Sequence, residues 1–248
     1  MRMSGMRCLL ICLLVLSGCA NELVLEEDGA LAVIPHRTGE SGLIVVEASV
    51  NGHGPFKLAV DTGASISVIY EKAGAAAAIE PVQGEQVNVL GMTGAGIFPV
   101  AEVERISVGS ENWDSARVAL LPDTGPMDER VDGILGLDFL SRYAIWFSQK
   151  DRVLRLYPRE LVANRVYDGW SAIELYEMRV GNGDVSVYAF DIFVDGERIP
   201  TIFDLGASFN VMNRRAAQRL DVRTRTPADA ADVHGVIGQI PILAEVLV

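Results

Sequence analysis

Two aspartates, each on a tight turn after an apolar strand, are the residues of this 248-residue chain best placed to do chemistry. Asp61 follows the apolar segment 56–60, and Asp204 follows 199–203. The glycine two positions after each aspartate lets the turn bring backbone N–H groups toward the carboxylate. Two carboxyl groups about 3 Å apart cannot both ionise, so they share one proton and serve as acid and base. We therefore expect Asp61 and Asp204 to form one acid–base pair from two half-sites.

The elements that must position these aspartates occur twice in the same order. In each copy a strand, a turn and a second strand lead into the aspartate, and a short helix and a further hairpin follow it. This repetition predicts an all-β, bilobed fold with short helices, in which 41–160 form the first lobe and 161–248 the second. The first copy is predicted to contain strands 43–50 and 56–60, helix 70–78, hairpin 86–100 and strands 103–108, 116–121, 144–147 and 152–157; the second contains strands 186–194 and 199–203, helix 213–220 and hairpin 233–242.

The second copy departs from the first in two ways. Leu205 stands where the first turn has Thr62, so one hydroxyl is missing. The apolar segment Ile134-Leu135-Gly136 lies 73 to 75 residues after Asp61, and the same offset from Asp204 falls beyond Val248. We therefore expect the second lobe to be incomplete, and an apolar last strand would be an exposed edge.

Three motifs, occurring in order, resemble those of the aspartic proteases, that is, the pepsin and retropepsin families. They are the turn Asp61–Ser65, the glycine-rich hairpin at 90–100, and Asp132–Gly136. The likeness is greatest to bacterial retropepsin-like proteins, here with two lobes in one chain, and it covers 41–157 well and 185–248 partly. The resemblance implies an acid-protease fold and an endopeptidase that hydrolyses peptide bonds with an Asp61/Asp204 dyad.

The same resemblance implies roles for the residues around the dyad. Thr62 would brace the opposing loop, and Gly63 and Gly206 would shape the two turns. The segment Ile134-Leu135-Gly136 would cross behind the first turn and complete its loop. The hairpin tip Gly91-Met92-Thr93-Gly94 would act as a flap over bound peptide. Asp138, which follows that segment, is expected to be a turn or surface acid.

Three functional hypotheses remain open on the sequence alone. In the first, Asp61 and Asp204 form a dyad within one chain, in a cleft between the lobes. In the second, two chains pair their first lobes as a homodimer, and each gives one Asp61. In the third, the protein is a peptide-binding module that does not catalyse, because Leu205 replaces the bracing threonine and the second supporting strand is missing.

The N-terminus is typical of a bacterial lipoprotein signal. Arg2 and Arg7 precede a short apolar run at 9–16, and Leu16-Ser17-Gly18-Cys19 resembles the lipoprotein processing box. We expect 1–18 to be a signal peptide, Cys19 to be lipidated, and 19–40 to be a tether in which 31–34 could add an edge strand. These features predict a lipid anchor in the bacterial cell envelope, with outer-membrane sorting on the periplasmic side.

Charge and composition narrow the classes of partner. Removing 1–18 takes away two arginines and no acid, so the net charge moves from −12 to −14. Such a charge argues against nucleic acid, which needs a positive surface. Cys19 would be the only cysteine of the processed chain, and the three histidines (His36, His53, His234) show no metal-ligand spacing. We expect no metal and no cofactor, and a peptide or protein as the partner of a monomer or homodimer.

Overall fold

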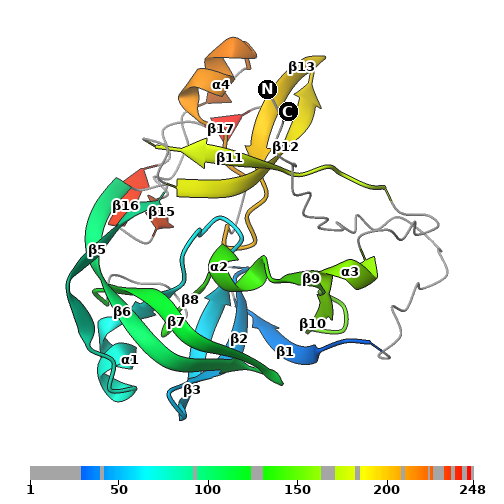
Figure 1. Ribbon diagram of the computed structural model, residues 1–248. Coiled ribbons are helices and arrows are strands. Elements are labelled where there is room, and N and C mark those ends of the chain that lie inside the picture. Colours follow the sequence, from blue (N-terminus) through cyan, green and yellow to red (C-terminus); the bar gives the residue numbers. More distant parts are fainter. Residues whose placement is uncertain are drawn as a thin grey trace, which may run out of the picture.

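The computed structural model describes residues 29–39, 42–91, 94–123, 131–162, 171–181, 185–207, 210–222, 224–225, 232–235, 238–241 and 245–246, with side chains as far as residue 222 (Figure 1). Most of these residues lie in strands, and the helices are short, which confirms the all-β prediction. The described residues contain no helix long and apolar enough to cross a membrane.

The first lobe is built on a ten-stranded sheet in the order β5-β6-β7-β4-β8-β3-β2-β1-β10-β9. The long strand β6 also pairs with β2, so the strands from β6 through β7, β4, β8 and β3 to β2 close into a ring. The strands are β1 Ala32–Thr38, β2 Ile44–Val50, β3 His53–Val60, β4 Val68–Tyr70, β5 Pro81–Gly91, β6 Gly94–Val108, β7 Glu111–Leu121, β8 Gly133–Leu135, β9 Tyr143–Ser148 and β10 Val153–Pro158; the helices are α1 Glu71–Ala76, α2 Leu137–Leu140 and α3 Arg159–Val162.

The alternation of apolar residues along these strands explains the core. On β2, β3 and β6 the inward-facing side chains, such as Val46, Leu58 and Ile106, are almost completely shielded from water. Phe139 of α2 joins the same apolar cluster. Closure of the ring leaves few unpaired strand edges, so burial can fix the position of the loop that follows β3.

Two sequence-based boundaries need correction. The strand expected at 103–108 is the second half of β6, which runs unbroken from Gly94 to Val108 because it pairs with β5 and then with β7. The segment expected as tether up to residue 40 contains β1, which is internal to the sheet between β2 and β10 rather than an edge. Ala32 and Ile34 are buried in the core, and that burial holds β1 in the folded body.

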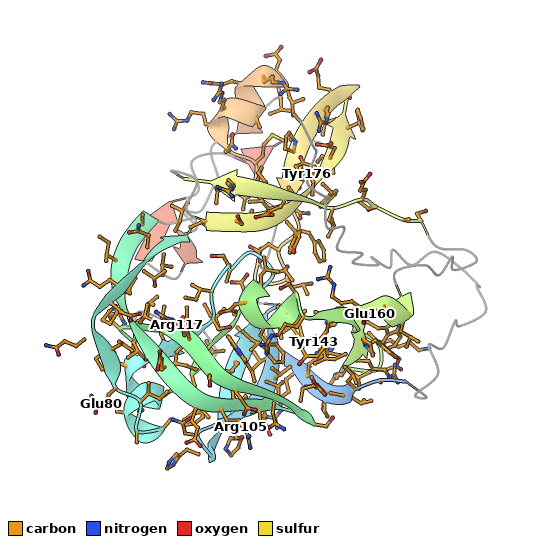
Figure 2. The ribbon with its side chains drawn as sticks, in the orientation of Figure 1. Glu80, Arg105, Arg117, Tyr143, Glu160 and Tyr176 are labelled. Carbon is orange, nitrogen blue, oxygen red and sulfur yellow. The ribbon has the colours of Figure 1, made fainter. Side chains whose placement is uncertain are left out.

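The second lobe is smaller and lies beside the aspartate loop of the first lobe in Figure 1. Its main sheet has the order β11-β12-β13. Tyr176 of β11, labelled in Figure 2, and Arg198 of β13 both contact Asp191 of β12, which ties the three strands together. The elements are β11 Tyr176–Val180, β12 Val185–Val194, β13 Glu197–Ile202, α4 Arg214–Arg219, β14 Thr224–Arg225, β15 Asp232–Gly235, β16 Gly238–Pro241 and β17 Glu245–Val246.

The order of these elements repeats that of the first lobe. A hairpin (β12 and β13) leads to Asp204, the helix α4 follows, and β15 pairs with β16 as a further hairpin. The side chain of Asn213 caps α4 by accepting a hydrogen bond from the N–H of Ala216, which satisfies one N–H at the helix start. The duplication read from the sequence is thus present in the structure.

Candidate active site

The position of Asp61 is set by the strand beside it. Strand β3 ends at Val60, and β8 runs parallel to it with Val60 opposite Leu135. The N–H of Asp61 then donates to the carbonyl of Leu135 (3.1 Å), and the N–H of Leu137 donates to the carbonyl of Ala64 (2.8 Å). Ile134, Leu135 and Gly136 thus cross behind the first turn and hold both of its ends.

A second layer of contacts supports this loop and was missed in the sequence. Asp138 is half-buried and accepts hydrogen bonds from the N–H (2.8 Å) and the hydroxyl (2.6 Å) of Ser67. The Ser67 oxygen in turn accepts from the N–H of Gly136 (2.9 Å). Asp138 is therefore an internal brace, and the expectation of a surface acid was wrong. The sequence signal for this internal role was a single acid among neighbours with buried side chains, namely Leu137, Phe139 and Leu140.

The structure brings the two aspartates together. A Cβ added at Gly63 would lie 2.7 Å from Cγ of Asp204, and one added at Gly206 would lie 2.5 Å from Cγ of Asp61. Any side chain at these glycines would therefore collide with the opposing carboxyl group. The requirement for glycine comes from this close approach, which the sequence attributed to turn geometry alone.

The electrostatics of Asp61 follow from this contact. Burial raises the pKa of Asp61 from 3.8 to about 7, and the charge of Asp204 and a hydrogen bond to its carboxyl group act in the same direction. The N–H groups of Gly63 (2.7 Å) and Ala64 (3.0 Å) donate to Oδ1 of Asp61 and oppose the rise in its pKa. A hydrogen bond between two carboxyl groups needs one proton, so the two acids share it and titrate as a pair.

Thr62, in the first lobe, connects the two aspartate loops. Its hydroxyl donates to the carbonyl of Phe203 (2.8 Å) and accepts from the N–H of Leu205 (2.9 Å). Thr62 is 2% exposed, so both contacts are shielded from water. Leu205 has no hydroxyl, so it cannot make the equivalent hydrogen bonds to the first loop. Its side chain packs instead against the core of the first lobe.

The hairpin of β5 and β6 approaches the first loop from one side. Val87, Val89 and Phe98 pack against the apolar cluster that contains Tyr70, and Ala64 of the first loop packs against the same cluster. Burial, together with the charge of Asp61, raises the pKa of Tyr70 to about 12, so its hydroxyl stays protonated near the dyad. Tyr70 was not singled out in the sequence.

The tip of this hairpin also reaches the second lobe. Gly91 and Gly94 pair at its end. A Cβ added at Gly181, at the end of β11, would lie 3.2 Å from Cδ2 of Leu90. Met92, Thr93 and Cys19 lie outside the described residues. Within the described part of the chain, no group of three or more His, Cys, Asp or Glu residues is placed to hold a metal ion.

Comparison with known proteins finds a family model that matches part of the first lobe. Residues 46–139 match the family model described as aspartyl protease. A solved retropepsin-like aspartic protease from Rickettsia conorii matches with 18% identity and a TM-score of 0.38, over 51% of this chain and 89% of that one. No curated protein matches the chain. For residues 46–139, the family model therefore supports the aspartic protease family that the motifs indicate.

Proposed function

We propose that this chain is an aspartic endopeptidase whose dyad is Asp61 and Asp204 of the same chain. The observation that carries the proposal is the close approach of each carboxyl group to the glycine of the opposing turn, through which two duplicated turns bring both acids into one site. That contact lies within one chain, which favours this arrangement over a homodimer of first lobes.

The chemistry assigns a different role to each carboxyl group. Asp204, as the carboxylate, takes a proton from a water molecule, whose oxygen attacks the carbonyl carbon of the peptide bond. Asp61, which holds the shared proton, donates it to the carbonyl oxygen. The tetrahedral intermediate then collapses, its nitrogen gains a proton, and the C–N bond breaks to give a carboxylic acid and an amine. Because this cycle needs one proton on the pair, activity should fall as the pH rises through about 7.

The hairpin with Gly91 and Gly94 at its end is the candidate flap over bound peptide. Its side chains Val87, Val89 and Phe98 are apolar and partly buried on the same side as the first loop. The proposed substrate is accordingly an extended peptide or an unfolded segment of a protein.

The test is cleavage of a peptide library by the purified chain between about pH 3 and pH 8, with mass spectrometry of the products. We expect cleavage that Asp61→Asn and Asp204→Asn each abolish and that Asp195→Asn, at an exposed turn, leaves unchanged. Cleavage that survives either dyad substitution would contradict the proposal. Loss with Asp61→Asn alone, in a protein that is dimeric by mass measurement, would favour the homodimer of first lobes.

One observation favours a peptide-binding module as the second candidate. Among the described residues of its own loop, Asp204 accepts only the N–H of Gly206 (2.7 Å), and the N–H of Ala207 contacts the backbone carbonyl of Asp204 instead (3.4 Å). A less enclosed carboxylate could leave binding intact while catalysis fails. Binding of peptides with no cleavage at any pH would select this candidate.

We also propose that Cys19 carries the lipid anchor of a cell-envelope protein, on the strength of the processing box Leu16–Cys19. Expression in a Gram-negative bacterium with labelled palmitate tests it. The wild-type chain should be labelled and fractionate with the outer membrane, and Cys19→Ser should be unlabelled and released. Labelling of the Cys19→Ser variant would contradict the proposal.

A further inference from the structure

One end of the ten-stranded sheet has an outward face that is apolar and exposed. Strands β1, β10 and β9 form this end, opposite β5, and α3 follows β10 (Figure 1). On β1, Ala32 and Ile34 point inward and are buried in the core, whereas Leu31 and Val33 point outward and are 42% and 43% exposed. Because β1 is paired on both sides, a partner would meet this face rather than a free strand edge.

The strand register places a cation and an aromatic ring beside Val33. Val33 lies opposite Arg155 of β10, and Arg155 lies opposite Trp146 of β9. Directly opposed residues of antiparallel strands share a face. The guanidinium carbon of Arg155 is 4.4 Å from the ring centroid of Trp146, so the cation stacks on the indole. An aliphatic, a cationic and an aromatic side chain thus form one row across the three strands.

This end of the first lobe is basic, although the chain as a whole is acidic. Segments 29–39 and 141–162 hold six basic and two acidic residues, whereas the whole chain holds 21 basic and 33 acidic residues. One of the two acids, Asp151, already accepts a hydrogen bond from the hydroxyl of Ser148 (2.8 Å). Arg37 contacts Glu47 at 3.6 Å, but both side chains are more than half exposed, so this pair contributes little. The basic residues are Arg37, Arg142, Lys150, Arg152, Arg155 and Arg159.

The chain enters the folded body at this same end. A Cβ added at Gly29 would lie 3.2 Å from Cδ2 of Leu161 in α3. The ten steps of chain from Cys19 to Gly29 can span at most about 35 Å. An acyl chain on Cys19 would therefore hold this end of the first lobe within that distance of the bilayer.

We propose that this face docks on the surface of an anionic phospholipid bilayer; its residues are Leu31, Val33, Arg37, Trp146, Arg152 and Arg155. Leu31 and Val33 would enter the headgroup boundary, where tryptophan is also favoured, and the arginines would contact lipid phosphates. Apolar burial and attraction of basic residues to anionic lipid act together at such surfaces. The docking face does not include the dyad, so the proposal can fail while the proposed hydrolysis stands.

The test uses the processed chain, residues 19–248, with Cys19→Ser, so that neither the signal nor an acyl chain contributes to binding. Sedimentation measures its partition onto vesicles of phosphatidylcholine with or without about 30% phosphatidylglycerol. Binding to the anionic vesicles should be at least about tenfold stronger and should weaken as salt is added. The double variant Arg37→Gln and Arg152→Gln should lower the partition coefficient about twentyfold. Val33→Ser should lower it about fivefold, because less apolar surface is buried.

A matched control removes two arginines from the second lobe. Arg214→Gln with Arg215→Gln, at exposed positions of α4, should leave binding unchanged, and circular dichroism checks that each variant is folded. The proposal is overturned if both kinds of vesicle bind equally, if the Arg37 and Arg152 variant binds as tightly as its parent, or if the control loses as much binding. A dimer by mass measurement that Val33→Ser dissociates would also overturn it, because a second copy of the chain would then cover the face.

Discussion

The two aspartate loops have nearly the same sequence but different support. Asp61 accepts two N–H groups from its own loop, at 2.7 and 3.0 Å, and β8 and the pair Ser67 and Asp138 stand behind it. Asp204 accepts one N–H from the described part of its loop, that of Gly206, at 2.7 Å. The turn sequence is thus enough to deliver a carboxyl group, and the surrounding elements decide how firmly it is held. In this chain the first lobe supplies that support.

The connection between the loops is equally one-sided. Apart from the contact between the two carboxyl groups, the described hydrogen bonds across it both use the hydroxyl of Thr62, and they reach the backbone atoms of Phe203 and Leu205 in the second loop. A single buried hydroxyl therefore aligns Asp204 with the better supported Asp61. This asymmetry can be tested by weakening each side in turn.

The largest effect is expected from the carboxyl groups themselves. Asp61→Asn and Asp204→Asn should each lower kcat/KM by about three orders of magnitude or more, because one carboxyl group alone cannot act as both the acid and the base. The two losses should be similar, and the double variant should be no worse than either single one. Steady-state kinetics on one cleaved peptide measures this. Clearly unequal losses would mean that the loops do not form a single site.

The next largest effect is expected from Thr62, whose hydroxyl connects the two aspartate loops. Thr62→Val removes both bonds and leaves the Phe203 carbonyl and the Leu205 N–H unpaired, so unfolding free energy should fall by about 2–4 kcal/mol. Activity should fall as well, because Asp204 loses its alignment. Denaturant unfolding and kinetics measure the two losses. Thr62→Ser keeps the hydroxyl and should behave nearly as wild type; equal damage from both substitutions would argue that packing, not hydrogen bonding, matters.

A smaller loss of stability is expected when the contact between Asp138 and Ser67, behind the first aspartate loop, is weakened. Asp138→Asn leaves one acceptor oxygen for the N–H and the hydroxyl of Ser67, so unfolding free energy should fall by about 1–3 kcal/mol. Ser67→Ala should cost a similar amount, since it leaves the Gly136 N–H unpaired. The double variant should cost less than the sum of the two, because they share one network. Strict additivity in denaturant unfolding would refute the shared brace.

The smallest effect is expected from giving the second loop the threonine that the first loop has. Leu205→Thr supplies the missing second hydroxyl, which can add at most about 1 kcal/mol per hydrogen bond formed. It also removes apolar contact with the first-lobe core, so the net change in unfolding free energy should stay within about 1 kcal/mol. A large gain in activity with unchanged stability would instead identify Leu205 as the residue that limits the site.

The sequence predicted most of what local patterns control. The turns, the hairpin strands beside them and the helix before Leu220 were visible because each has its own residue pattern. The closure of the sheet through β2 and β6 was not visible, since it joins strands far apart in the chain. The brace of Ser67 and Asp138 was missed for the same reason: a buried acid and a surface acid look alike until their partners are known.

The central claim is that Asp61 and Asp204 share one proton, and titration of their carboxyl carbons by NMR tests it most directly. The account predicts that Asp61 titrates near a pKa of about 7 in the wild-type chain. In Asp204→Asn its pKa should fall part of the way back toward 3.8, because burial remains while the neighbouring charge is gone. A pKa of Asp61 near 3.8 in the wild-type chain, or one that Asp204→Asn does not change, would contradict the account.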